Sequence, residues 1–114
     1  LVDRKANMII TGGENVFPSE VENLLGSHPA VKYVAVIGIP HEKWGEAIKA
    51  IVTVHQGKTV TEKELVDHCR GKIAGYKIPK SVDFIKDEEM PMTAQGKILH
   101  RILREKYGKW SDMK

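Results

Sequence analysis

The sequence has few of the features that mark membrane, secreted or metal-binding proteins. Its 114 residues include one cysteine, Cys69, so no intrachain disulfide can form and a reducing, cytoplasmic compartment is expected. Cys69 lies among apolar positions of an expected helix, which indicates a buried structural thiol rather than a nucleophile. No apolar run approaches the roughly 20 residues of a membrane-spanning helix, and no signal peptide is visible. The five histidines lack the spacing of metal ligands, so no metal site is expected.

The sequence has only a small excess of positive charge. The net charge is +3, and Lys and Glu are interleaved, although residues 77–109 are richer in Lys and Arg than the rest. This balance suits a small anionic ligand at least as well as nucleic acid, so no nucleic-acid partner is expected. Hydrophobic residues (41%) and charged residues (29%) are present in the proportions of one globular domain with a modest core. The chain starts at Leu1 rather than Met, so we expect it to be a piece of a longer protein.

Apolar patterning predicts three strands behind a small N-terminal hairpin. Met8 to Thr11 is β-like and ends at the turn signal Gly12-Gly13. The β-branched run 31–39, which Pro29 and Pro40 bound, indicates a strand. Residues 47–55 alternate as a strand with one buried face and one partly wet face, and residues 81–85 are a third candidate.

Three helices are expected between and after these strands. Pro18 suits the first turn of a helix that ends at Gly26. Thr61 and Glu64 form a capping box, which starts a helix expected to run until Gly75. Apolar positions between residues 98 and 103 mark a last amphipathic helix. The order predicts an α+β domain of two layers, in which helices pack on a three-stranded sheet.

The segment richest in potential chemistry runs from Pro91 to Leu99. Gly96 permits backbone conformations closed to other residues, and Lys97 places a compact cation beside it, just before a helix. Such a lysine can stabilise charge developing between a carboxylate and a phosphate, an effect of ~3–4 kcal/mol. A solvated lysine at a loop–helix junction is the alternative. The upstream Gly and following Ser/Thr of a phosphate-binding P-loop are absent.

Four other segments have both a binding and a structural interpretation. Gly12 and Gly13 allow close approach of a ligand before the helix at Pro18, or simply form a turn. Arg4 can bind hydroxyls or phosphates, or lie in solvent. The remaining two segments contain aromatic rings, which are either ligand-binding surfaces or structural side chains at the edge of the core or over the sheet. These rings are Tyr76, which is followed by Lys77 and Lys80, and Trp44, in the turn between two expected strands.

Taken in order, these segments resemble the C-terminal domain of the adenylate-forming superfamily, which contains acyl-CoA synthetases, luciferases and peptide-synthesis adenylation domains. The resemblance extends from residue 3 to about residue 107 and is strongest to bacterial medium- and long-chain acyl-CoA synthetases. The matching stretches are Asp3 to Lys5, Met8 to Val16, Pro18 to Glu22, His28 to Val31, Val36 to Pro40, Lys43 to Glu46, Tyr76 to Lys80 and Pro91 to Leu99.

This resemblance implies a two-step reaction. ATP and a carboxylic acid give an acyl-adenylate with Mg²⁺ assisting; after a large domain rotation, CoA forms the thioester. The position of Lys97 serves the adenylation step, and that of Arg4 binds the ribose of the nucleotide. The remaining matched positions are expected near CoA: Gly12, Gly13, Trp44, Tyr76, Lys77 and Lys80.

The sequence departs from the family pattern at two positions. The hinge, expected near residues 4–7, has Ala6 where relatives usually carry Asp or Lys. Ile78 stands where some relatives place an Arg near the CoA phosphates.

We expect the chain to be the mobile C-terminal domain of a fatty-acid–CoA ligase, inactive without its N-terminal adenylation domain. Two alternatives remain open. The parent enzyme is an aryl-CoA ligase or another adenylate-forming enzyme, or the chain is a stand-alone module that binds an anionic partner.

Overall fold

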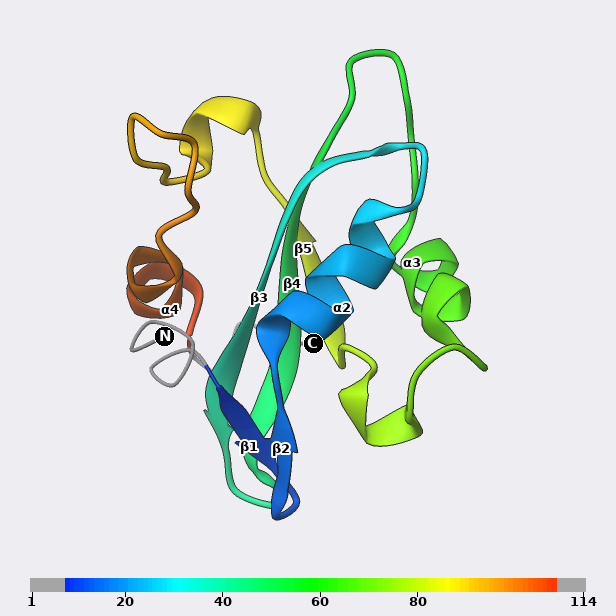
Figure 1. Cartoon of the computed structure of the whole chain (residues 1–114), viewed down its shortest axis with the longest axis vertical. Helices are drawn as coiled ribbons and strands as arrows, with labels where there is room; N and C mark the ends of the chain where they lie inside the picture. The colour runs from blue at the N-terminus through cyan, green and yellow to red at the C-terminus, as the bar shows by residue number, and fades with distance from the viewer. Residues whose placement is uncertain (1–7, 109–114) are drawn as a thin grey trace.

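The computed structural model describes residues 8–108, which form two β-sheets, three α-helices and two short 3₁₀ helices (Figure 1). In chain order the elements are β1 (Ile9–Thr11), β2 (Glu14–Val16), α2 (Pro18–Gly26), β3 (Val31–His41), β4 (Gly45–Val54), α3 (Glu62–Cys69), η1 (Gly75–Lys77), β5 (Ser81–Phe84), η2 (Asp87–Glu89) and α4 (His100–Tyr107). Within these residues, no helix is long and apolar enough to cross a membrane.

The main sheet has the strand order β3–β4–β5. β3 and β4 form a long antiparallel pair, in which Val31 lies opposite Val54 and His41 opposite Gly45. β5 is parallel to β4, which is possible because α3 lies in the connection between these two strands. β1 and β2 form a separate antiparallel hairpin, and β1 packs near β4.

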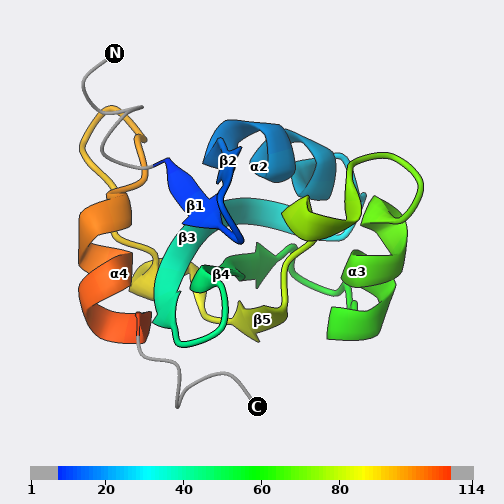
Figure 2. The same cartoon turned by 90° about the horizontal axis from the view of Figure 1, so that it is seen from below.

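Helices cover both faces of the main sheet (Figures 1 and 2). Alternate residues of β4 point to opposite faces, as a strand requires. Ile48, Ala50 and Val52 join a core cluster with residues of α2 and α3. Ala47 and Ile51 join a second cluster, to which α4 contributes. Because each face has its own covering helices, β4 is buried on both sides.

Local sequence signals explain where two helices begin. Pro18 is the first residue of α2, where its fixed φ suits a helix and its missing N–H costs nothing. At α3 the capping box is complete: the Thr61 hydroxyl accepts a hydrogen bond from Glu64 N at 3.1 Å, and Thr61 N donates to Glu64 Oε1 at 2.9 Å. Both starts were expected from the sequence.

The α+β class, the three-stranded sheet packed by helices and the N-terminal hairpin are confirmed. Three details were wrong. β3 continues through Pro40 to His41, because an edge strand tolerates a residue that cannot donate a ladder hydrogen bond. α3 ends at Cys69, where Arg70 becomes extended and Gly71 has φ +77°, well before Gly75. The expected wet face of β4 is buried beneath α4 and the segment before it, so the sheet lies between helices on both faces and the domain has three layers rather than the expected two.

Candidate functional site

Lys97 lies at the end of a hydrogen-bonded turn between η2 and α4. Thr93 N donates to Lys97 O at 2.9 Å, and Gly96 N donates to Thr93 O at 2.9 Å. Lys97 N in turn donates to the Thr93 hydroxyl at 3.1 Å. Gly96 has φ +88°, a conformation that other residues rarely adopt, so the glycine beside Lys97 is required by the turn itself. The expected loop is therefore an ordered hairpin-like turn.

This turn continues into the body of the domain through its two flanking residues. Met92 and Ile98 form an isolated antiparallel bridge, and both pack against the cluster that contains Leu103 of α4. Leu99 N donates to Pro91 O at 2.9 Å. Lys97 is exposed, so its ammonium group is presented at the surface on a turn whose base is packed.

The second group of predicted residues begins at the glycine turn of the β1–β2 hairpin. Gly12 and Gly13 have φ values of +58° and +84°, which explains why glycine occupies both positions. Gly12 N donates to Trp44 O at 2.8 Å and so attaches the hairpin to the β3–β4 connection.

A shallow pocket of about 120 Å³ opens beside this hydrogen bond. Four of the predicted CoA residues contribute to it. The residues that line it are Thr11, Gly12, Glu14, Trp44, Tyr76 and Lys80. The structure thus brings together segments that lie more than sixty positions apart in the sequence, between Gly12 and Lys80.

The Trp44 ring contacts both a lysine and a histidine side chain. Lys80 Nζ lies 4.7 Å from the centre of the Trp44 ring, within range of a cation–π contact. The His41 ring stacks on Trp44 with centroids 4.2 Å apart and 19° between the ring planes. Trp44 is partly buried and packs against the second core cluster, so it is both a cover for the sheet and a wall of the pocket.

Lys77 and Gly13 are close in sequence to pocket residues but do not line the pocket. Lys77 Nζ instead donates to both carboxylate oxygens of Glu20, at 2.9 and 3.1 Å. The hydrogen bond to Glu20 raises the pKa of Lys77, although desolvation opposes it. Sequence reasoning missed this pair, as it missed Thr11 and Glu14 in the pocket.

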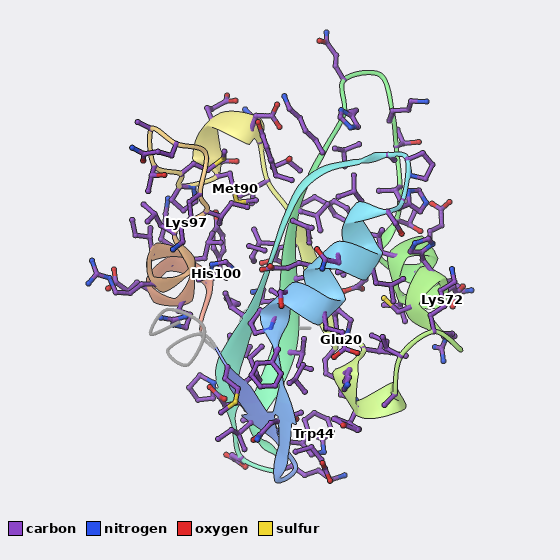
Figure 3. The ribbon with its side chains drawn as sticks, viewed as in Figure 1. Glu20, Trp44, Lys72, Met90, Lys97 and His100 are labelled. Atoms are coloured by element: carbon purple, nitrogen blue, oxygen red, sulfur yellow. The ribbon has the colours of Figure 1, made fainter. Side chains whose placement is uncertain are left out.

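The Lys97 turn and the Trp44 pocket are separate surfaces. Figure 3 shows Lys97 beside α4, whereas Trp44 lies at the far end of the β3–β4 hairpin. Arg4 and Ala6 lie outside the described residues, so the predicted ribose contact and hinge have no structural description here.

Two further expectations concern cysteine and metal chemistry. Cys69 is fully buried, as predicted, and burial raises the pKa of its thiol while Lys72 opposes the shift. Between residues 8 and 108 there is no group of three or more His, Cys, Asp or Glu residues placed to hold a metal ion.

A family model and the sequences of known proteins both match this chain, and they point to the same family. The model described as AMP-binding enzyme C-terminal domain matches residues 20–97. Long-chain fatty-acid–CoA ligase FadD13 of Mycobacterium tuberculosis is 49% identical over 105 residues, which cover 92% of this chain and 20% of the relative. A feruloyl-CoA synthase from an Amycolatopsis species is 46% identical over 108 residues, covering 95% of this chain and 22% of the relative.

A solved structure agrees with these sequence matches. Apo MatB from Rhodopseudomonas palustris has a TM-score of 0.83 and 38% sequence identity, over 90% of this chain and 20% of that one. The chain therefore spans about a fifth of the length of the relatives it matches. With the family model matched over most of its length, this chain belongs to the family of AMP-binding enzyme C-terminal domains.

Proposed function

We propose that this chain is the mobile C-terminal domain of an AMP-forming acyl-CoA ligase and serves both steps of its reaction. The observation that carries the proposal is that this domain has two separate surfaces, each formed by residues that match the family pattern. One surface presents Lys97 on a packed turn, and the other groups Gly12, Trp44, Tyr76 and Lys80 around a pocket. The hinge is proposed near residues 4–7, and the N-terminal adenylation domain is the required partner.

In the adenylation step, Lys97 is proposed to donate hydrogen bonds to oxygens of the carboxylate and the α-phosphate. An ammonium group already aimed at the charge that develops there stabilises the transition state more than the ground state. ATP as the nucleotide is supported by the solved ATP-bound form of MatB. We assign the ribose contact to Arg4, and we assign no described residue to Mg²⁺.

In the thioester step, the pocket is proposed to contact CoA. The exposed ring of Tyr76 and the face of Trp44 offer stacking surfaces for adenine or packing surfaces for the pantetheine chain. Lys80 supplies a cation for the phosphates, and Lys77 would join it only by leaving Glu20. Gly12 and Gly13 leave the backbone open to close approach, since no atom lies within 4 Å of a Cβ built on either.

A fatty acid is the proposed acyl substrate, with an aromatic acid as the second candidate. The relatives at 49% and 46% identity are a long-chain fatty-acid ligase and a feruloyl-CoA synthase, so similarity in this domain supports both classes nearly equally. A panel of fatty and aromatic acids tested on the intact enzyme separates them by kcat/KM.

The decisive test replaces Lys97 with Ala in the intact enzyme and follows the two half-reactions separately. Adenylation is expected to fall by about 10²–10³, the usual effect of removing one donor to transition-state charge. Thioester formation from supplied acyl-adenylate should remain. Lys58→Ala is the matched control, because Lys58 is an exposed lysine in a turn elsewhere. Equal loss of both half-reactions in Lys97→Ala would refute the assignment.

A further inference from the structure

The base of the Lys97 turn is joined to the rest of the domain by a contact between two side chains. His100 is the first residue of α4 and follows Lys97 by three positions. Its Nε2 lies 2.6 Å from Oε2 of Glu22 in α2, across 78 positions of sequence. An ionised carboxylate only accepts hydrogen bonds, so His100 Nε2 carries the proton and donates. Figure 3 shows His100 on the side of α4 that faces α2.

This contact is largely removed from water. The side chains of His100 and Glu22 are 15% and 19% exposed. At such burial a hydrogen bond to a carboxylate is stronger than at the surface, and losing one partner leaves the other poorly solvated. The pair is therefore a well-defined attachment between α4 and α2, unlike an exposed ion pair at the surface.

Glu22 connects a third element at the same atom. Its Oε2 also accepts a hydrogen bond from Val36 N at 2.9 Å. β3 lies at the edge of the sheet, so an outward-facing N–H there needs a partner other than a neighbouring strand. One carboxylate oxygen thus ties the N-terminus of α4 to both α2 and β3.

The hydrogen bonds within the turn do not themselves attach it to the rest of the domain. The bonds among Pro91, Thr93, Lys97 and Leu99 are internal to the turn. Packing of Met92 and Ile98 on the core is apolar and therefore non-directional. Lys49 Nζ donates to Tyr107 O at 3.2 Å, but this holds the opposite end of α4. A rotation of α4 about that far end would displace Lys97 while leaving the turn's own bonds intact.

We propose that Glu22 and His100 are positioning residues for adenylation, which fix the direction in which the Lys97 turn projects. This inference rests on the proposed role of Lys97. Neither side chain needs to touch a substrate. A displacement of about 1 Å at a reacting group is enough to cost ~10²-fold in rate, so a loosened attachment should be visible in the first half-reaction.

The sharpest test compares two amides at position 100 in the intact ligase. His100→Gln places its amide nitrogen near the position of Nε2, whereas His100→Asn places it nearer that of Nδ1. Both lose the ring, but only Gln keeps a donor within reach of Glu22. We expect His100→Asn to lower kcat of adenylation by at least about tenfold and His100→Gln to restore most of it. Thioester formation from supplied acyl-adenylate should change less than about twofold in both.

Two controls separate positioning from folding. Val82 lies in β5, at the edge of the sheet opposite β3, so Val82→Ala removes core volume and lowers stability without removing a partner of the attachment. Glu22→Leu, which keeps a side chain of similar size and removes the oxygen that accepts from both His100 and Val36, should reproduce the selective adenylation loss if His100→Asn proves too unstable to purify. Val82→Ala should lower the melting temperature without selective loss of adenylation.

Several outcomes would overturn the inference. They are equal losses in both half-reactions that track melting temperature, identical behaviour of the Asn and Gln variants at position 100, or full adenylation activity in His100→Asn and Glu22→Leu. If Lys97→Ala leaves adenylation intact, the proposed function fails first. If Lys97→Ala abolishes adenylation while His100→Asn and Glu22→Leu do not, only the positioning role fails.

Discussion

The carboxylate of Glu46 accepts a hydrogen bond from the backbone amide of Ile10, with 2.8 Å between Oε1 and N. This bond joins β4 to β1 and lies near the Gly12–Trp44 backbone contact. Gly38 of β3 allows β1 to approach closely, since a Cβ at position 38 would lie 2.9 Å from the side chain of Ile9. The hairpin is therefore attached by side-chain and backbone contacts at once, although it belongs to a separate sheet.

Glu46→Ala is expected to loosen the β1–β2 hairpin without unfolding the domain. The loss of one hydrogen bond to a charged group should reduce its docking by ~1.5–3 kcal/mol. Amide hydrogen exchange at Ile10 and Gly12 should become faster, while exchange within β4 stays slow. In the intact enzyme the thioester step should weaken and adenylation should not. Unchanged exchange at Ile10 would show that the hairpin is held without Glu46.

Trp44→Ala is expected to raise the KM for CoA. The substitution removes the ring that Lys80 approaches at 4.7 Å and a wall of the pocket. An increase of about five- to tenfold corresponds to ~1 kcal/mol, the size of an exposed cation–π or stacking contact. Trp44→Phe should retain much of the affinity because it keeps an aromatic face.

The neighbouring lysines provide an internal comparison for that experiment. Lys80→Ala should raise the KM for CoA more than Lys77→Ala, because Lys77 is paired with Glu20 and does not line the pocket. Steady-state kinetics at saturating ATP and acid measure both. A larger effect at Lys77 would mean that it exchanges Glu20 for the CoA phosphates.

Asp83→Asn is expected to destabilise the domain more than Lys49→Met. Lys49 is fully buried, and its Nζ lies 2.8 Å from Asp83 Oδ2, whereas Asp83 is one-third exposed. Neutralising Asp83 leaves a buried ammonium without its counter-charge, which costs about 3 kcal/mol. Lys49→Met leaves the Asp83 carboxylate without its partner, but water can solvate this partly exposed group, so the loss of stability is smaller. Urea denaturation of the two variants gives the comparison, and the reverse ranking would contradict it.

His68→Gln is expected to reduce the loss of stability at acid pH. Burial, followed by the charges of Lys72 and His28, lowers the pKa of His68 from its ordinary value of 6.5. Below that value the unfolded chain binds a proton that the folded chain resists, so stability present above pH 6.5 is lost as the pH falls.

The measurement for His68 is the melting temperature between about pH 7.5 and about pH 5. The drop should be smaller in His68→Gln than in the unmodified chain, because Gln does not titrate. His28→Gln is the control: it removes the His28 ring, which lies 5.3 Å from the His68 ring in an edge-on contact, and leaves His68 in place. An equal drop in His68→Gln would assign the acid sensitivity to other groups.

Local signals in the sequence were sufficient for most of the fold. The capping box at Thr61, the proline at residue 18 and the runs of β-branched residues each act over a few positions, so they are readable without a structure. The end of α3 was misjudged because Ile73 continues the apolar pattern after the backbone has left the helix at Arg70. Burial of both faces of β4 depends on α4, which lies almost fifty positions further along the chain.

The site was predictable to a lesser degree. The ordered motifs identified Gly12, Trp44, Tyr76 and Lys80, and the fold placed them around one pocket. The partners of charged residues were not predictable, because Glu20 meets Lys77 across 57 positions and Glu22 meets His100 across 78. Such pairs are set by how α2 packs against distant segments, and no spacing rule in the sequence encodes them.

Glu46 secures the glycine hairpin and Glu22 secures the Lys97 turn, and these two carboxylates share no hydrogen-bond partner in the described chain. Free-energy changes at separated sites without common partners are usually additive. Substitutions at the two attachments should therefore act as independent variables. If the proposed function holds, a substitution at one attachment should change the rate of one half-reaction and leave the rate of the other unchanged.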